Sequence, residues 1–117
     1  MFEIIATDQF EKDIKYYKRK KRFTHIDDDI DAIISELERG NFIGDEISGL
    51  SLPEGEGTYK VRAINSDTNA GKLNGYRLIY YVVREDGKVF LLTVYYKKDK
   101  EDISRDEIIH LIKLYCA

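Results

Sequence analysis

The stretch GYRLIYYVVREDGKVFLLTVYYK spans residues 75–97 and decides the fold. Residues 75–84 and 88–97 are rich in the β-branched and aromatic side chains that favour strands. Asp86 and Gly87 stand between them, and an Asp-Gly pair flanked by apolar runs is a strong signal for a tight hairpin turn. The sequence therefore predicts an antiparallel hairpin, with the side chains of each strand alternating between the two faces of a sheet.

Working outward from the hairpin, we predict a third strand at residues 58–65 and a short first strand at residues 2–6. Thr7 or Asp8 is predicted to cap a helix that carries Phe10, Ile14 and Tyr17 at helical spacing. The whole chain has 117 residues, which is enough to bury one modest hydrophobic core.

A second helix is predicted to begin near Thr24, with Asp27 completing an approximate capping box, and to end at Gly40. Residues 41–57 hold four glycines and the only proline, so they are predicted to form a long connection. Ser104 is predicted to cap a last helix, with Glu107 three residues further on. This last helix is apolar enough either to pack on the sheet or to dock against a partner, and packing is the preferred interpretation.

These elements predict an α+β fold in the order strand, helix, helix, strand, strand, strand, helix. We expect one domain over residues 1–117, with a small antiparallel-rich sheet, two N-terminal helices on one face, and a C-terminal helix.

Charge is segregated along the chain, although the net charge is only −3. Residues 59–100 hold nine bases against four acids, whereas residues 23–57 hold ten acids against Arg39 alone. Alternation puts Lys60 and Arg62 on one strand face, Tyr59 and Val61 on the other, and Arg77 on the face opposite Tyr76 and Leu78. We therefore expect one face of the sheet to be core and the other to be wet and basic. A basic face on an otherwise acidic protein favours a polyanionic partner. The alternative is that each charged block is a solvated helix face or turn.

Composition bears on the redox compartment of the protein, on membrane segments and on metal binding. The single cysteine, Cys116, cannot form an internal disulfide, which fits a reducing cytoplasm. The apolar runs are short, so we expect neither a signal peptide nor a membrane span. No set of His, Cys and carboxylate side chains recurs at ligand spacing, so we expect no metal and no cofactor.

Three stretches resemble the RelE/ParE superfamily of bacterial toxins from type II toxin-antitoxin modules, and RelE-like and HigB-like members most closely. They are Tyr59-Lys60-Val61-Arg62, Gly71-Lys72 with Gly75-Tyr76-Arg77-Leu78-Ile79-Tyr80-Tyr81, and Leu91-Leu92-Thr93-Val94-Tyr95-Tyr96-Lys97-Lys98 leading into Glu101-Asp102-Ile103. The resemblance implies an endoribonuclease that cleaves messenger RNA, usually in the ribosomal decoding site. It also implies an antitoxin partner, and contact with DNA only through the antitoxin complex.

The resemblance assigns roles by motif position. Arg77 would stabilise the transition-state phosphate, and Lys60 or Arg62 would activate the nucleophile or hold the scissile phosphate. Tyr95 or Tyr96, with Lys97, would lie beside the leaving group, and we favour Tyr95 with Lys97.

The residues themselves permit such chemistry only in one form. Cleavage by internal transfer needs the 2′-hydroxyl deprotonated, the pentacoordinate phosphorus stabilised and the leaving 5′-oxygen protonated. His25 and His110 lie outside the basic strands, so the acid, base and charge-stabilising groups would have to be Lys, Arg and Tyr side chains. Aromatic rings beside basic groups also suit single-stranded RNA. The remaining residues predicted to bind RNA are Lys72, Tyr96, Lys98 and Lys100.

Two alternatives stay open: a ParE-like inhibitor of DNA gyrase without nuclease activity, and a relative that binds RNA without cutting it.

The chain also departs from the family's pattern. The loop at residues 65–74 is longer than a minimal hairpin, and the C-terminus lacks a basic or histidine-bearing tail, which leaves Tyr115 as a minor catalytic candidate.

Overall fold

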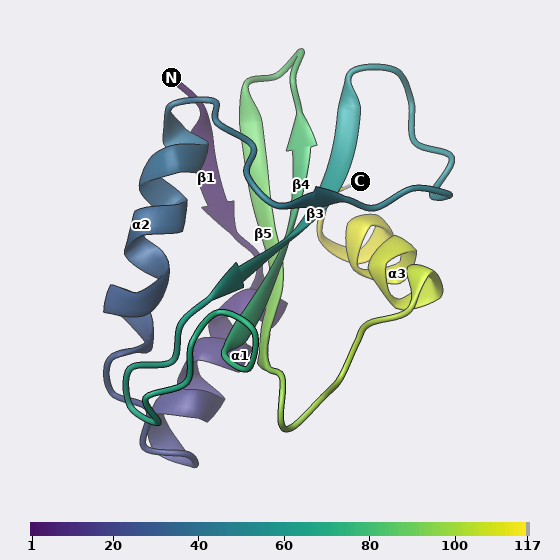
Figure 1. Cartoon of the computed structure of the whole chain (residues 1–117). Helices are drawn as coiled ribbons and strands as arrows, with labels where there is room; N and C mark the ends of the chain where they lie inside the picture. The colour runs from purple at the N-terminus through teal and green to yellow at the C-terminus, as the bar shows by residue number, and fades with distance from the viewer. Residues whose placement is uncertain (117) are drawn as a thin grey trace.

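The computed structural model of the protein describes residues 1–116 and contains one five-stranded sheet flanked by three helices (Figure 1). The elements follow the predicted order, with one short strand added, so the predicted α+β class is confirmed. Their bounds are β1 Glu3–Ala6, α1 Asp8–Arg19, α2 Ile26–Glu38, β2 Asp45–Glu46, β3 Glu56–Ala63, β4 Tyr76–Val83, β5 Lys88–Tyr96 and α3 Arg105–Tyr115.

The sheet has the strand order β1-β5-β4-β3-β2. Strand β1 runs parallel to β5, and every other neighbouring pair is antiparallel. The predicted hairpin is confirmed as the β4–β5 pair, and Gly87 supplies the positive φ of 64° in its turn.

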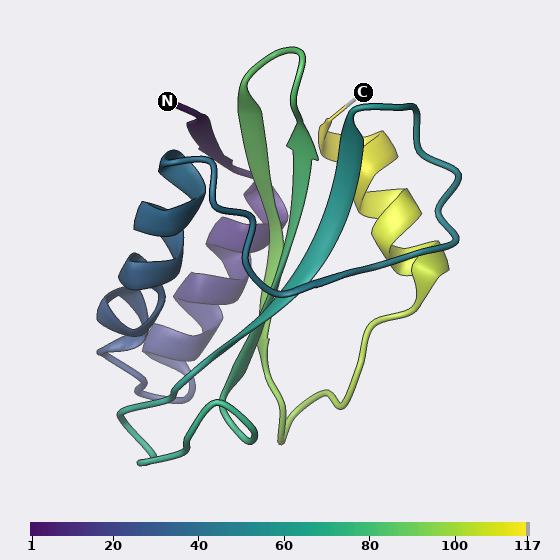
Figure 2. The same ribbon diagram turned by 45° about the horizontal axis from the view of Figure 1, so that its top comes forward.

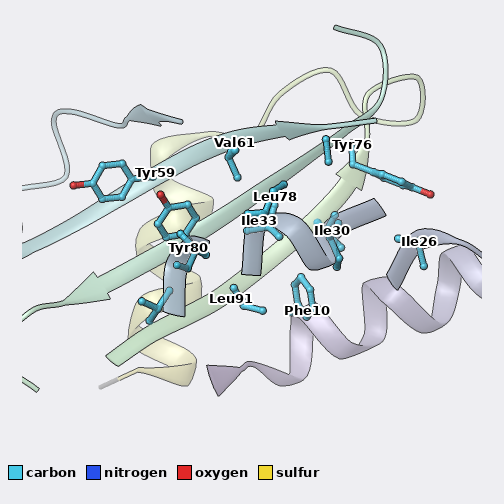
Figure 3. Close-up of a cluster of buried hydrophobic side chains, with 14 of the residues drawn as sticks. Phe10, Ile26, Ile30, Ile33, Tyr59, Val61, Tyr76, Leu78, Tyr80 and Leu91 are labelled. Carbon is cyan, nitrogen blue, oxygen red and sulfur yellow. The ribbon is translucent and has the colours of Figure 1, made fainter. Parts of the chain in front are cut away.

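The two faces of the sheet are covered by different helices (Figure 2). Helices α1 and α2 pack on one face through a large cluster of buried side chains (Figure 3). Phe10 and Ile30 contribute from the helices, and Tyr59, Leu78 and Leu91 contribute from three strands. Helix α3 packs on the other face, where Ile108 joins a smaller cluster that includes Ile79 and Leu92. Of the two placements considered for the last helix, packing on the sheet is therefore the one observed.

The helix starts follow from side-chain caps in two cases out of three. The Oγ1 of Thr7 accepts a hydrogen bond from the Phe10 N–H at 3.2 Å, and the Oγ of Ser104 accepts one from the Glu107 N–H at 3.1 Å. The predicted capping box at Thr24 and Asp27 is wrong. Helix α2 begins at Ile26, and His25 at its N-cap makes no side-chain hydrogen bond to the helix. The Thr24 hydroxyl does not cap the helix either, since it lies 3.4 Å from the Nδ1 of His25.

Residues 41–57 were predicted to be irregular, and this holds except for β2 and for Glu56 and Gly57, which begin β3. The two residues of β2 pair with Tyr59 and Lys60 of β3. Gly44 permits this approach, because a Cβ there would lie 2.5 Å from the carbonyl oxygen of Lys60. Among the described residues, no helix is long and apolar enough to cross a membrane.

Candidate functional site

The predicted catalytic residues converge on the face of the sheet that carries α3. Strand pairing sets Arg62 of β3 opposite Arg77 of β4, and Arg77 opposite Tyr95 of β5. These three residues therefore form a row across the sheet, which we call the cross-strand row. Lys60 lies two residues before Arg62, so alternation places it on the same face. Four of the five predicted residues are brought together by the register alone.

Arg77 is the most constrained member of the row. It is only 3% exposed, and its guanidinium donates hydrogen bonds to three backbone carbonyls. The acceptors are Lys72 at 2.9 Å, Tyr76 at 3.2 Å and Leu73 at 2.7 Å. Burial, and then the charge of Arg62, lower the pKa of Arg77. The side chain thus anchors the loop before β4 and adds positive charge beneath the site.

Tyr95 is also buried, at 4% exposed, and its hydroxyl has no hydrogen-bond partner in the described structure. Burial, and then the negative charge of Asp102, raise its pKa to about 12. The ammonium of Lys100 lies over the Tyr95 ring, 5.8 Å from the ring centroid, which is a cation–π distance. Tyr95 is therefore protonated at neutral pH, as a group that gives a proton to a leaving oxygen must be.

Tyr95 and Tyr96 lie on opposite faces of the sheet, and only Tyr95 shares the face of Arg77. Tyr96 points to the opposite face, where it is 5% exposed and packs against Phe23 at a centroid distance of 5.3 Å. Its hydroxyl lies 3.3 Å from the Oγ1 of Thr68. A base of RNA has no access to this ring, so the structure does not place Tyr96 with the other predicted RNA-binding residues.

The predicted lysines divide between two places. Lys97 and Lys98 follow β5 directly, Lys97 half-buried and Lys98 exposed, and Lys100 pairs with Glu107 at 2.7 Å. Lys72 lies instead with Lys60 and Arg62 along a groove of about 700 Å³ between β3 and α2. The opposite wall of that groove carries Asp28, Asp29 and Glu36. Bases and acids therefore face each other across it.

The site face is less open than the sequence indicates. Alternation predicts one wet and basic face, but Ile79, Tyr81 and Leu92 on that face are buried under α3 and residues 47–52. Of the cross-strand row, Arg62 is exposed, and Lys60 beside it is partly exposed. The prediction of a wholly solvated face is wrong because alternation shows which side chains share a face and not what covers them.

One functional candidate was missed. Asp102 lies between β5 and α3, and its carboxylate accepts a bond from the Lys60 ammonium at 3.2 Å. These residues are 42 positions apart, so spacing gave no sign of the contact. Both border a cleft of about 460 Å³ with Ser104, Arg105 and Asp106.

The two histidines lie away from this site. His25 contacts Asp67 through its Nδ1 at 2.8 Å, and that bond raises its pKa. His110 is exposed on α3, and Tyr115 ends the same helix. Within residues 1–116 no group of three or more His, Cys, Asp or Glu side chains is arranged to hold a metal ion.

Neither a protein-family model nor a curated protein matches the chain.

Proposed function

We propose that the protein is the toxin of a type II toxin-antitoxin module and that it cleaves messenger RNA on the ribosome. The observation that carries the proposal is the cross-strand row, in which Arg62, Arg77 and Tyr95 stand in register with Lys60 beside them. An RNA-cleaving site without histidine needs such a cluster of cations and a protonated hydroxyl.

The proposed reaction is an internal transfer. The 2′-hydroxyl beside Lys60 or Arg62 gives its proton to water, and its oxygen attacks the adjacent phosphorus. The bond to the 5′-oxygen breaks as Tyr95 gives that oxygen a proton, which leaves a cyclic phosphate and a free 5′-hydroxyl, and Tyr95 then regains a proton from water. Lys60 and Arg62 hold the scissile phosphate, and the charge of Arg77 stabilises the pentacoordinate phosphorus from beneath. Tyr95, with Lys97 beside it, lies next to the leaving 5′-oxygen and gives it a proton. The reaction needs no metal and no cofactor.

The partners proposed with this function are a neutralising antitoxin, messenger RNA and the ribosome, in the cytoplasm. DNA would be contacted only through the antitoxin complex.

A second candidate function is RNA binding without cleavage. The burial of Arg77 and Tyr95 favours it, because the Arg77 guanidinium already serves three carbonyls and the Tyr95 hydroxyl is enclosed. On this alternative, Lys60 and Arg62 still bind phosphate, but no group acts on the leaving oxygen.

The test is induced expression of the chain with mapping of messenger 5′ ends, with and without active translation. The variant is K60A/R62A, because both side chains reach the surface whereas Arg77 supports the loop. The matched control is K12A/K15A, which removes the same charge from exposed positions of α1 on the other side of the sheet.

We expect wild type and K12A/K15A to stop growth and to produce new 5′ ends in translated messages. K60A/R62A should lose about 100-fold in cleavage, the cost of removing groups that stabilise transition-state charge. Undiminished cleavage by K60A/R62A would rule out the proposed site. Growth arrest with DNA damage and no new 5′ ends would indicate a gyrase inhibitor.

A further inference from the structure

The segment 97–104 turns at the end of β5 and runs beside the sheet to α3 (Figures 1 and 2). It has no regular secondary structure, and we call it the covering segment. Two of its side chains touch the site: Lys100 lies over the Tyr95 ring, and Asp102 pairs with Lys60. One short stretch of chain therefore contacts two members of the site, while Lys60 stays partly exposed.

Asp102 presents an anion to the site. Its Oδ1 accepts from the Lys60 ammonium at 3.2 Å and from the Ile103 N–H at 2.8 Å. The bond from Ile103, with those from Lys60 and the charge of Arg77, keeps its pKa below the ordinary 3.8. The carboxylate is therefore ionised at neutral pH, and it lies in the field of both cations.

Resting on the proposed function, we propose that the Asp102 carboxylate occupies, in the free protein, the position at Lys60 where a backbone phosphate of RNA binds. Carboxylate and phosphodiester groups both offer anionic oxygens to an ammonium group. Two such anions repel each other when they share one cation, so the phosphate must displace Asp102.

The ion pair between Asp102 and Lys60, which the phosphate would replace, is cheap to break. The Asp102 side chain is 66% exposed, and Lys60 is 31% exposed. The Lys100–Glu107 pair is also at the surface, with exposed fractions of 40% and 52%. Exposed ion pairs contribute little to stability because water and salt screen them.

The variant D102N tests the proposal, since Asn keeps the size and the acceptor oxygen but loses the charge. The probe is a fluorescein-labelled, single-stranded 2′-O-methyl RNA, which internal transfer cannot cut. Binding is measured by fluorescence anisotropy with purified full-length protein at low and at physiological salt. We expect D102N to bind the probe about three- to tenfold more tightly than wild type, the size of one nearby like charge in a partly screened site.

The matched control is D106N, which removes one charge from the same cleft. We expect it to gain much less than D102N. K60A provides the second control, because D102N/K60A should bind no more tightly than K60A. Circular dichroism establishes that each variant is folded, and D102S replaces D102N if the latter does not fold.

Equal affinities of D102N and wild type would overturn the proposal, as would an equal gain in D106N or a gain that persists without Lys60. Absence of RNA binding in every variant would also overturn it. The outcome is separable from that of the nuclease. A Lys60-dependent gain in a protein that cuts no RNA keeps the phosphate position and removes the nuclease, whereas cleavage by wild type without any gain in D102N does the reverse.

Discussion

No side chain fits at position 75, because the backbone of β3 occupies the space that a Cβ would need. A Cβ at this position would lie 2.1 Å from the carbonyl oxygen of Ala63 and 3.1 Å from the Asn65 nitrogen. The carbonyl of Gly75 accepts the Lys97 N–H at 3.0 Å, which joins the start of β4 to the end of β5. The glycine therefore fixes the spacing of three strands next to Arg77.

We predict that Gly75→Ala destabilises the protein by about 3 kcal/mol, because the clash is between two backbones and neither can move aside. Urea denaturation of the purified variant measures the change in the free energy of unfolding. Gly71→Ala is the control, since a Cβ there meets nothing within 4 Å. Equal stability of the two variants would contradict this explanation.

At the scale of elements, one carboxylate fastens α1 to β5. Asp13 lies inside the helix, and its Oδ2 accepts from the Thr93 hydroxyl at 2.5 Å and from the Val94 N–H at 3.2 Å. Its Oδ1 accepts from Gln9 at 3.0 Å. Burial raises the pKa of Asp13 in spite of these bonds. The helix is thus joined to the strand that carries Tyr95.

We predict that Asp13→Ala lowers the free energy of unfolding by about 2 kcal/mol, because the Thr93 hydroxyl and the Val94 N–H lose their acceptor. Thermal or urea unfolding measures the loss. Lys12→Ala changes the neighbouring exposed position and should leave stability within about 0.5 kcal/mol of wild type. A loss of equal size in Lys12→Ala would contradict the role given to the Asp13 bonds, because alanine has the highest helix propensity and does not itself weaken a helix.

The strands were predictable because their periodicity is local. Alternation correctly placed Tyr59 and Val61 on one face and Arg77 opposite Tyr76 and Leu78, and these assignments follow from neighbouring residues alone. The Ser104 cap was predictable for the same reason.

Strand β2 was not predictable, since two residues carry no period and their pairing depends on the space that Gly44 leaves against Lys60. The covering segment was missed on similar grounds. The contact of Asp102 with Lys60 exists only once α3 has folded back over the sheet, and no local pattern encodes that return.

Over the whole molecule, the long loop before β4 is held by the acidic end of α2. Asp29 accepts from the Ser66 N–H at 2.9 Å, and Asp67 accepts from the backbone N–H of His25 at 3.0 Å. The His25 ring completes the contact with Asp67. Since the same loop supplies carbonyls to Arg77, α2 on one face of the sheet supports the site on the other.

We predict that this support weakens as the pH rises. The bond with Asp67 raises the pKa of His25 above its ordinary 6.5, so the folded state binds the proton more tightly than the unfolded state. The contribution is complete below about pH 6.5 and is lost as the pH passes the raised value. Urea midpoints measured from about pH 5.5 to 8.5 should fall in wild type. His25→Gln should flatten this slope, and His110→Gln should not; an unchanged slope in His25→Gln would contradict the prediction.

The parallel pairing of β1 with β5 also has a consequence for biosynthesis. Residues 3–6 pair with residues 88–91, so β1 has no partner until more than 80 further residues have been translated. Closing such a distant contact is slow compared with forming a helix or a hairpin. Strand β1 therefore stays unpaired until residues 88–91 have emerged from the ribosome, and the sheet reaches its full width only after synthesis has passed β5.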